Sequence, residues 1–156
     1  MLSDLYSEKI LDAAAAIPPA RRLAAPSASA TKTSRVCGST VTVDLELKDG
    51  AVVDFGMEAK ACALGQAAAS IVARNIIGAR AEDVCRLREK MRAMLKEGGD
   101  PPHQDAALGA RWKDLESLVS IRDYPQRHAS VLLVFEAACA CVEAVLSGEN
   151  GAVAKA

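Results

Sequence analysis

An alternating segment in the first third of the chain constrains the fold most strongly. Apolar residues occupy every second position of 41–47, with polar residues between them, and a period of two is typical of a half-buried β-strand. Asp49-Gly50 follows, a pair favoured in two-residue hairpin turns. The alternation returns over 53–57. We therefore expect an antiparallel hairpin, with room for a third strand ending near Cys37 or Lys60.

The rest of the chain is predicted to be mainly helical. Apolar residues recur at helical spacing, and Pro or Gly residues separate the segments. An α+β fold follows: a small antiparallel β-sheet of about three strands, with several helices packed on one face. The expected helices span 2–17 (with Ser3 as the N-cap), 61–78, 80–99, a short segment over 111–121 and a nearly all-apolar helix over 131–146.

The 156 residues suit one compact domain with a substantial core. We assign residues 1–148 to this domain. Within it, 18–35 contains Pro, Ser and Thr without periodicity, which predicts an irregular connector. Residues 149–156 are expected to form a flexible C-terminal tail.

Composition argues against several classes of function. The 19 basic and 20 acidic residues leave a net charge of −1, and aromatic residues make up only 3%, so neither nucleic acid nor a membrane is an expected partner. No uninterrupted apolar run approaches the roughly 18 residues of a membrane span. The N-terminus lacks the basic start of a secretory signal. Five cysteines, an odd and sparse set, favour a reducing cytoplasm.

Two of the cysteines occupy positions suited to chemistry. Cys37 precedes Gly38 at the entrance to the first strand, and Cys62 lies where the second strand gives way to a helix. The hairpin between them brings both loops to one end of the sheet. A helix N-terminus stabilises a thiolate, the form that metal binding and sulfur transfer both require. The spacing alone is equally compatible with two buried small hydrophobic residues. Core packing is expected for the cysteines in helical segments, which are Cys85, Cys139 and Cys141.

Four segments together resemble a known family. "LYSEKILD", "VCGS", "ACALGQAAAS" and "YPQRHASVLLVFEAA" are similar, in this order from about Leu5 to about Leu146, to the U-type iron–sulfur cluster assembly scaffolds (IscU, SufU and the NifU N-terminal domain). The resemblance implies an IscU/SufE-like fold. It also implies a site formed by a Cys-Gly-Asp turn, a Gly-Cys pair at a helix start and a late cysteine after a Pro-x-Arg/Lys stretch. In the family this site holds a nascent [2Fe–2S] cluster or zinc and accepts persulfide sulfur from a cysteine desulfurase.

The chain departs from the family pattern at the site itself. Ser39 stands where the family has Asp, and the glycine before the second cysteine is Ala61. The late cysteine is replaced by Ser130, or by Ala129 if the alignment is anchored on His128. His128 could then supply the missing ligand, because some family members have a histidine beside the late cysteine.

The resemblance implies an iron–sulfur cluster assembly scaffold or carrier rather than an enzyme. Cys37 and Cys62 are the expected sulfur acceptors and, with His128, the expected ligands of iron, zinc or a transient [2Fe–2S] cluster. The alternative is a protein without bound metal that keeps the fold, accepts sulfur or docks on assembly partners. A cysteine desulfurase and other assembly factors are the expected partners, with the chain a monomer or homodimer. No hydrolase, NTPase or glycosidase constellation stands out in the sequence.

Overall fold

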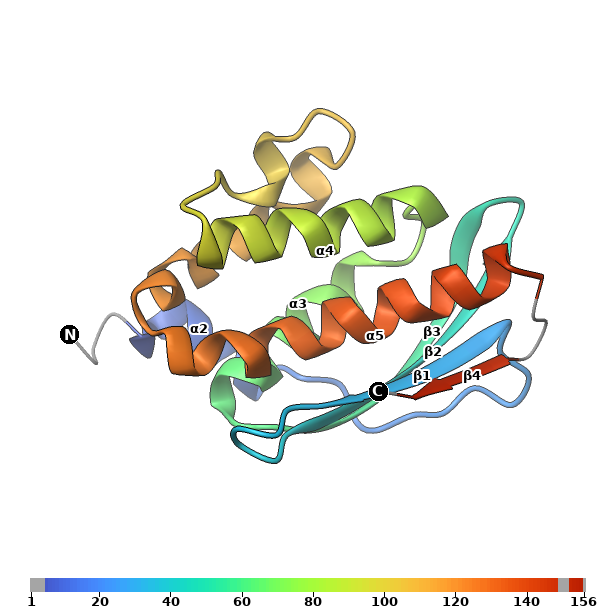
Figure 1. Ribbon diagram of the computed structural model, residues 1–156, viewed down its shortest axis with the longest axis horizontal. Helices are drawn as coiled ribbons and strands as arrows, with labels where there is room; N and C mark the ends of the chain where they lie inside the picture. Colours follow the sequence, from blue (N-terminus) through green and yellow to red (C-terminus); the bar gives the residue numbers. More distant parts are fainter. Residues whose placement is uncertain (1–4, 149–151, 156) are drawn as a thin grey trace.

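The computed structural model describes residues 5–148 and 152–155 of the protein. The fold is α+β, with helices packed against a four-stranded sheet (Figure 1). The sheet order is β3-β2-β1-β4. The elements are α2 (Glu8–Ala15), β1 (Ala28–Thr33), β2 (Thr40–Lys48), β3 (Ala51–Lys60), α3 (Ala63–Asn75), α4 (Ala81–Lys96), the 3₁₀ segments η1 (Pro102–Gln104), η2 (Gly109–Asp123) and η3 (Pro125–Arg127), α5 (His128–Leu146) and β4 (Ala152–Lys155).

The predicted hairpin is confirmed as β2 and β3, which pair antiparallel. Asp49 and Gly50 both have positive φ, 53° and 78°, as the tightest hairpin turns require. At the opposite end Thr40 pairs with Lys60. The residues just before β2 and just after β3 therefore lie side by side.

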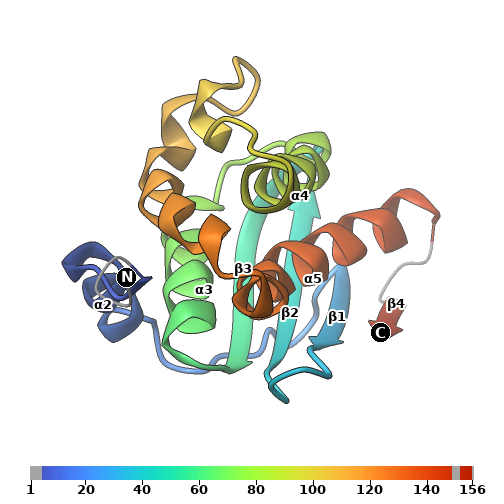
Figure 2. The same cartoon turned by 60° about the vertical axis from the view of Figure 1, so that its left-hand side comes forward.

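The helices cover one face of the sheet (Figure 2). The long helix α5 packs on β1 and β2, α3 packs on β3, and α4 lies against α5. The segment Pro125–Leu146 is long and apolar enough to cross a membrane, but 67% of its most apolar window is buried inside the protein. The core helix of a soluble protein has the same character, so this segment is weak evidence for a membrane span.

Two predictions about irregular segments were wrong. Residues 28–33, inside the expected connector, form β1, which pairs antiparallel with β2 and parallel with β4. Its Ala, Ser and Thr side chains are too weakly apolar to give a clear alternation, although Ala28 and Ala30 are buried. Residues 152–155, inside the expected flexible tail, form β4. The predicted cap Ser3 lies outside the described residues, and α2 is instead capped by Ser7, whose Oγ accepts a hydrogen bond from Ile10 N at 3.3 Å.

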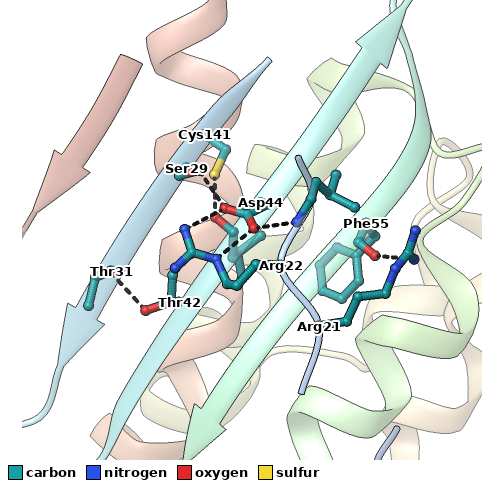
Figure 3. Close-up of polar contacts among 10 residues, drawn as sticks. Arg21, Arg22, Ser29, Thr31, Thr42, Asp44, Phe55 and Cys141 are labelled. Carbon is teal, nitrogen blue, oxygen red and sulfur yellow. Dashed lines mark hydrogen bonds and ion pairs between the residues drawn. The ribbon is translucent and has the colours of Figure 1, made fainter. Parts of the chain in front are cut away.

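The irregular segment between α2 and β1 packs on the face of the sheet opposite the helices. Asp44 on β2 is fully buried there, and its carboxylate accepts hydrogen bonds from Arg22 Nε at 2.7 Å, Leu23 N at 2.9 Å and the Ser29 hydroxyl (Figure 3). The strand pattern alone indicated a solvent-facing position at Asp44. The connector crosses over Asp44, and its hydrogen-bond donors take the place of water around the carboxylate.

Candidate functional site: two thiols at one end of the sheet

The first thiol lies on the turn between β1 and β2. Ser34 N donates to Ser39 O at 2.8 Å, and Gly38 N donates to Ser34 O at 2.8 Å, so the chain reverses within six residues. Gly38 has φ of +72°, a conformation that glycine adopts without strain. Cys37 is exposed on this turn. The tight turn thus presents the thiol instead of burying it.

The second thiol begins a helix. Cys62 follows β3 by two residues and is the N-cap of α3, with an extended backbone (φ −66°, ψ 171°). Its carbonyl accepts the first helical hydrogen bond, from Gln66 N at 2.9 Å. Cys62 is half-buried at this N-terminus of α3.

A serine from a third element joins the two thiols. Ser130, on the first turn of α5, has its Oγ 3.0 Å from Cys62 Sγ. The Ser130 hydroxyl is also among the groups that lower the pKa of Cys37. Cys37 Sγ lies 3.0 Å from Ser39 Oγ. The structure therefore places Ser39 beside Cys37 and Ser130 beside Cys62, at the same end of the sheet.

Gly65 makes this convergence possible. A Cβ atom at Gly65 would lie 2.8 Å from Ser130 Oγ and 2.8 Å from the Ala61 Cβ, closer than real atoms approach. The missing side chain lets the first turn of α5 pack directly on the first turn of α3. Sequence reasoning missed this role, because Gly65 reads as one more small residue in an Ala-rich helix.

The surroundings of Cys37 favour its thiolate. Its pKa is lowered to about 7, from an ordinary value of 9.0, because the Ser39 hydroxyl first, and then the Ser34 hydroxyl and the Ser39 backbone N–H, favour the thiolate. Burial opposes this change, and Ser130 adds to it. Ser34 Oγ is buried and has no hydrogen-bond partner within the described part of the chain. Ser34 could not be anticipated from the sequence, since any polar residue could begin such a turn.

The structure does not bring His128 into this group. The ring is buried, and its Nε2 lies 3.0 Å from Ile121 O and 3.1 Å from Arg122 O, so it ties the start of α5 to the end of η2. Over residues 5–148 and 152–155, no cluster of three or more His, Cys, Asp or Glu side chains is arranged to hold a metal ion. The hypothesis that His128 replaces a lost ligand has no geometric support.

The remaining cysteines divide into a pair and a single buried thiol. Cys85 on α4 and Cys139 on α5 are joined as a disulfide, with their Cα atoms 4.7 Å apart. The expected core packing is confirmed, since Cys139 is fully buried and Cys85 packs against the core. The disulfide was not predicted, because spacing along the chain does not reveal which helix faces meet. Cys141 is a buried core residue as predicted, and its thiol donates to Val43 O at 3.3 Å. Burial raises its pKa to about 12.

The fold and the pair of thiols at the sheet end match one class of protein, the U-type iron–sulfur cluster assembly scaffolds. The profile of the NifU-like N terminal domain family matches residues 5–131. The chain belongs to this family.

Individual relatives agree with this assignment. The chain is 29% identical over 133 residues, 85% of its length and 88% of the relative, to the iron–sulfur cluster assembly scaffold protein IscU of Thermotoga maritima. It is similar to the crystal structure of a NifU-like protein (N-terminal) from Brucella abortus, with 44% identity, a TM-score of 0.86, and 94% and 97% of the two chains covered. A putative SufU scaffold from Fervidobacterium islandicum shares the fold, with a TM-score of 0.78, 18% identity and coverage of 90% and 98%.

Proposed function

We propose that the protein accepts sulfur from a cysteine desulfurase on Cys37 and supports the assembly of an iron–sulfur cluster between Cys37 and Cys62, in the cytoplasm. The single observation that carries this proposal is the position of Cys37 and Cys62 at the same end of the sheet, where Thr40 pairs with Lys60 and Ser130 Oγ lies 3.0 Å from Cys62 Sγ. Family membership supplies the class of reaction, and the geometry supplies the two sulfur atoms that would take part.

Sulfur uptake follows from the chemistry of Cys37. Its exposed thiolate attacks the outer sulfur of a desulfurase persulfide. The S–S bond breaks, and its electron pair leaves with the desulfurase cysteine, so no external electron is needed. The lowered pKa of Cys37 makes a large thiolate fraction available near neutral pH.

Cargo binding is expected to be labile. Thiolates suit iron and zinc, whereas a neutral serine hydroxyl is a poor ligand for either metal. Cys37 and Cys62 offer two thiolates, and Ser39 and Ser130 offer only hydroxyls. A cluster or metal ion held here would need further ligands from a partner, a second subunit or a small thiol, which suits cargo that is passed on.

Anaerobic reconstitution with ferrous iron, cysteine and a cysteine desulfurase tests the proposal. We expect iron and acid-labile sulfide to accumulate on the parent chain and to be lost in Cys37→Ala and Cys62→Ala. Cys141→Ala is the matched control, because its thiol is buried in the core. Equal loading of all four proteins would contradict the proposal.

A second candidate is a sulfur acceptor that never stores a cluster. The shortage of ligands within the described residues favours it. In the same reconstitution, this protein would gain protein-bound sulfur but no iron.

A further inference from the structure

Cys37 and Cys62 approach each other from two separate elements. The pairing of Thr40 with Lys60 places the turn before β2 beside the start of α3. Ser130 Oγ is 3.0 Å from Cys62 Sγ, and Ser130 is among the side chains that lower the pKa of Cys37. The two thiols therefore lie at one end of the sheet with Ser130 as a common neighbour.

The groups around the thiols suit sulfur exchange better than chelation. Ser34, Ser39 and Ser130 are only 4%, 4% and 3% exposed, and the hydroxyl groups of Ser39 and Ser130 hydrogen-bond to the Cys37 and Cys62 sulfur atoms. Within the described part of the chain, no carboxylate, imidazole or third thiol completes a metal-binding group with the two cysteines. Two neighbouring thiols surrounded by buried hydroxyls resemble a dithiol redox centre.

From this arrangement we infer that Cys62 is the resolving thiol for sulfur bound to Cys37, and that the protein thereby releases sulfide and forms a Cys37–Cys62 disulfide. The inference rests on the proposed function for the origin of the sulfur. It adds an activity, the reduction of bound sulfur to sulfide.

The step balances without any outside reagent. The Cys62 thiolate attacks the inner sulfur of the Cys37 persulfide, a new S–S bond forms between the cysteines, and the old S–S bond breaks. Its electron pair leaves on the outer sulfur, which takes a proton and departs as hydrosulfide. The outer sulfur is reduced to the sulfide level and the Cys62 sulfur is oxidised, while the Cys37 sulfur exchanges one S–S bond for another and keeps its oxidation state. A dithiol reductant, such as dithiothreitol or a thioredoxin-class protein, then restores both thiols for another cycle.

Peptide mapping after anaerobic loading tests the inference. The reduced protein receives inorganic polysulfide, is quenched with an alkylating agent at successive times and is digested with trypsin. Cleavage after Lys and Arg separates residues 36–48, which contain Cys37, from residues 61–74, which contain Cys62. We expect an early persulfide on the first peptide, then a disulfide joining the two peptides as sulfide appears.

Variants decide which thiol acts. In Cys62→Ser and Cys62→Ala, the Cys37 persulfide should persist at least about tenfold longer, because the intramolecular attacker is gone. Cys141→Ser should behave as the parent. Persulfide decay at the parent's rate in both Cys62 variants would overturn the inference. It would also be overturned if the parent moved the sulfur to Cys62 as a persulfide, or if no disulfide between the two peptides formed.

Polysulfide makes this test independent of the desulfurase. If polysulfide-loaded protein releases sulfide through the disulfide but a desulfurase cannot load Cys37, the proposed function fails and the resolving role of Cys62 stands. If a desulfurase loads Cys37 but the persulfide is stable beside Cys62, the resolving role fails and the proposed function stands.

Discussion

Ser130 Oγ lies 3.0 Å from Cys62 Sγ, although 68 residues separate them along the chain. This contact joins the start of α5 to the start of α3. We propose that the Ser130 hydroxyl occupies the position of the family's late cysteine. The consequences of that replacement for metal binding can be measured directly.

The double variant Ser39→Asp with Ser130→Cys should bind zinc far more tightly than the parent. It rebuilds a set of three thiolates and one carboxylate, and the negative charge of these ligands offsets the positive charge of the zinc ion. We expect a gain of more than about 100-fold, since even outer-sphere partners of a metal are worth roughly 10- to 100-fold. Competition with a chromophoric chelator at one fixed pH measures the affinity, because thiolates must lose protons to bind. An unchanged affinity would mean that these side chains do not converge as described.

Alkylation of Cys37 should depend on pH through its own lowered pKa. The thiol is protonated and slow to react at low pH, and the rate should rise with a midpoint near the pKa of about 7. Ser39→Ala removes a donor to the thiolate, so the midpoint should move up toward the ordinary value of 9.0. Mass spectrometry of residues 36–48 after timed alkylation provides the rates. Ser117→Ala, at a distant exposed hydroxyl, should leave the midpoint in place, and a midpoint unmoved by Ser39→Ala would refute the assigned cause.

Gly65→Ala should destabilise the protein, although alanine is the better helix former. The new Cβ would meet Ser130 Oγ and the Ala61 Cβ at 2.8 Å, and overpacking of this kind costs about 1–3 kcal/mol. Urea unfolding measures the change in the free energy of unfolding. Combining Gly65→Ala with Ser130→Ala should recover part of the loss. A more stable Gly65→Ala protein would show that α3 and α5 are not so closely packed.

The buried carboxylate of Asp44 should make stability depend on acid pH. Burial raises the pKa of Asp44, but hydrogen bonds from Arg22, Ser29 and Leu23 N outweigh it and hold the pKa below its usual value. A depressed pKa adds stability above the unfolded-state value of about 4, and this stability is lost as the pH falls through the folded-state pKa. The free energy of unfolding should therefore fall more steeply below about pH 4 in the parent than in Asp44→Asn.

At neutral pH, Asp44→Asn should lower the free energy of unfolding by about 1–3 kcal/mol. Asp54, paired with Arg21 at 3.1 Å but partly exposed, provides the matched control, and Asp54→Asn should lower the free energy of unfolding clearly less than Asp44→Asn, because exposed ion pairs contribute little. Equal costs at the two positions would contradict the buried role of Asp44.

The sequence predicted the elements with strong periodicity and missed those whose cause lies in distant contacts. The hairpin at Asp49-Gly50 and the apolar helix α5 follow from local patterns. The strand β1 does not, because its small residues become a strand only by pairing with β2. At the site, the positions of Cys37 and Cys62 could be anticipated from the hairpin. The orientation of His128 and the pairing of Cys85 with Cys139 depend on which helix faces meet, and no spacing along the chain encodes that.

The site of sulfur transfer tests the central claim most directly. The reduced parent chain is incubated anaerobically with a cysteine desulfurase and cysteine labelled with ³⁵S, alkylated and digested, and the label is located among the cysteine peptides. We predict label on residues 36–48 first, with Cys37→Ala abolishing it there and Cys141→Ala leaving it unchanged. Label spread evenly over all five cysteines, or absent from Cys37 in a parent chain that still binds sulfur, would contradict the account.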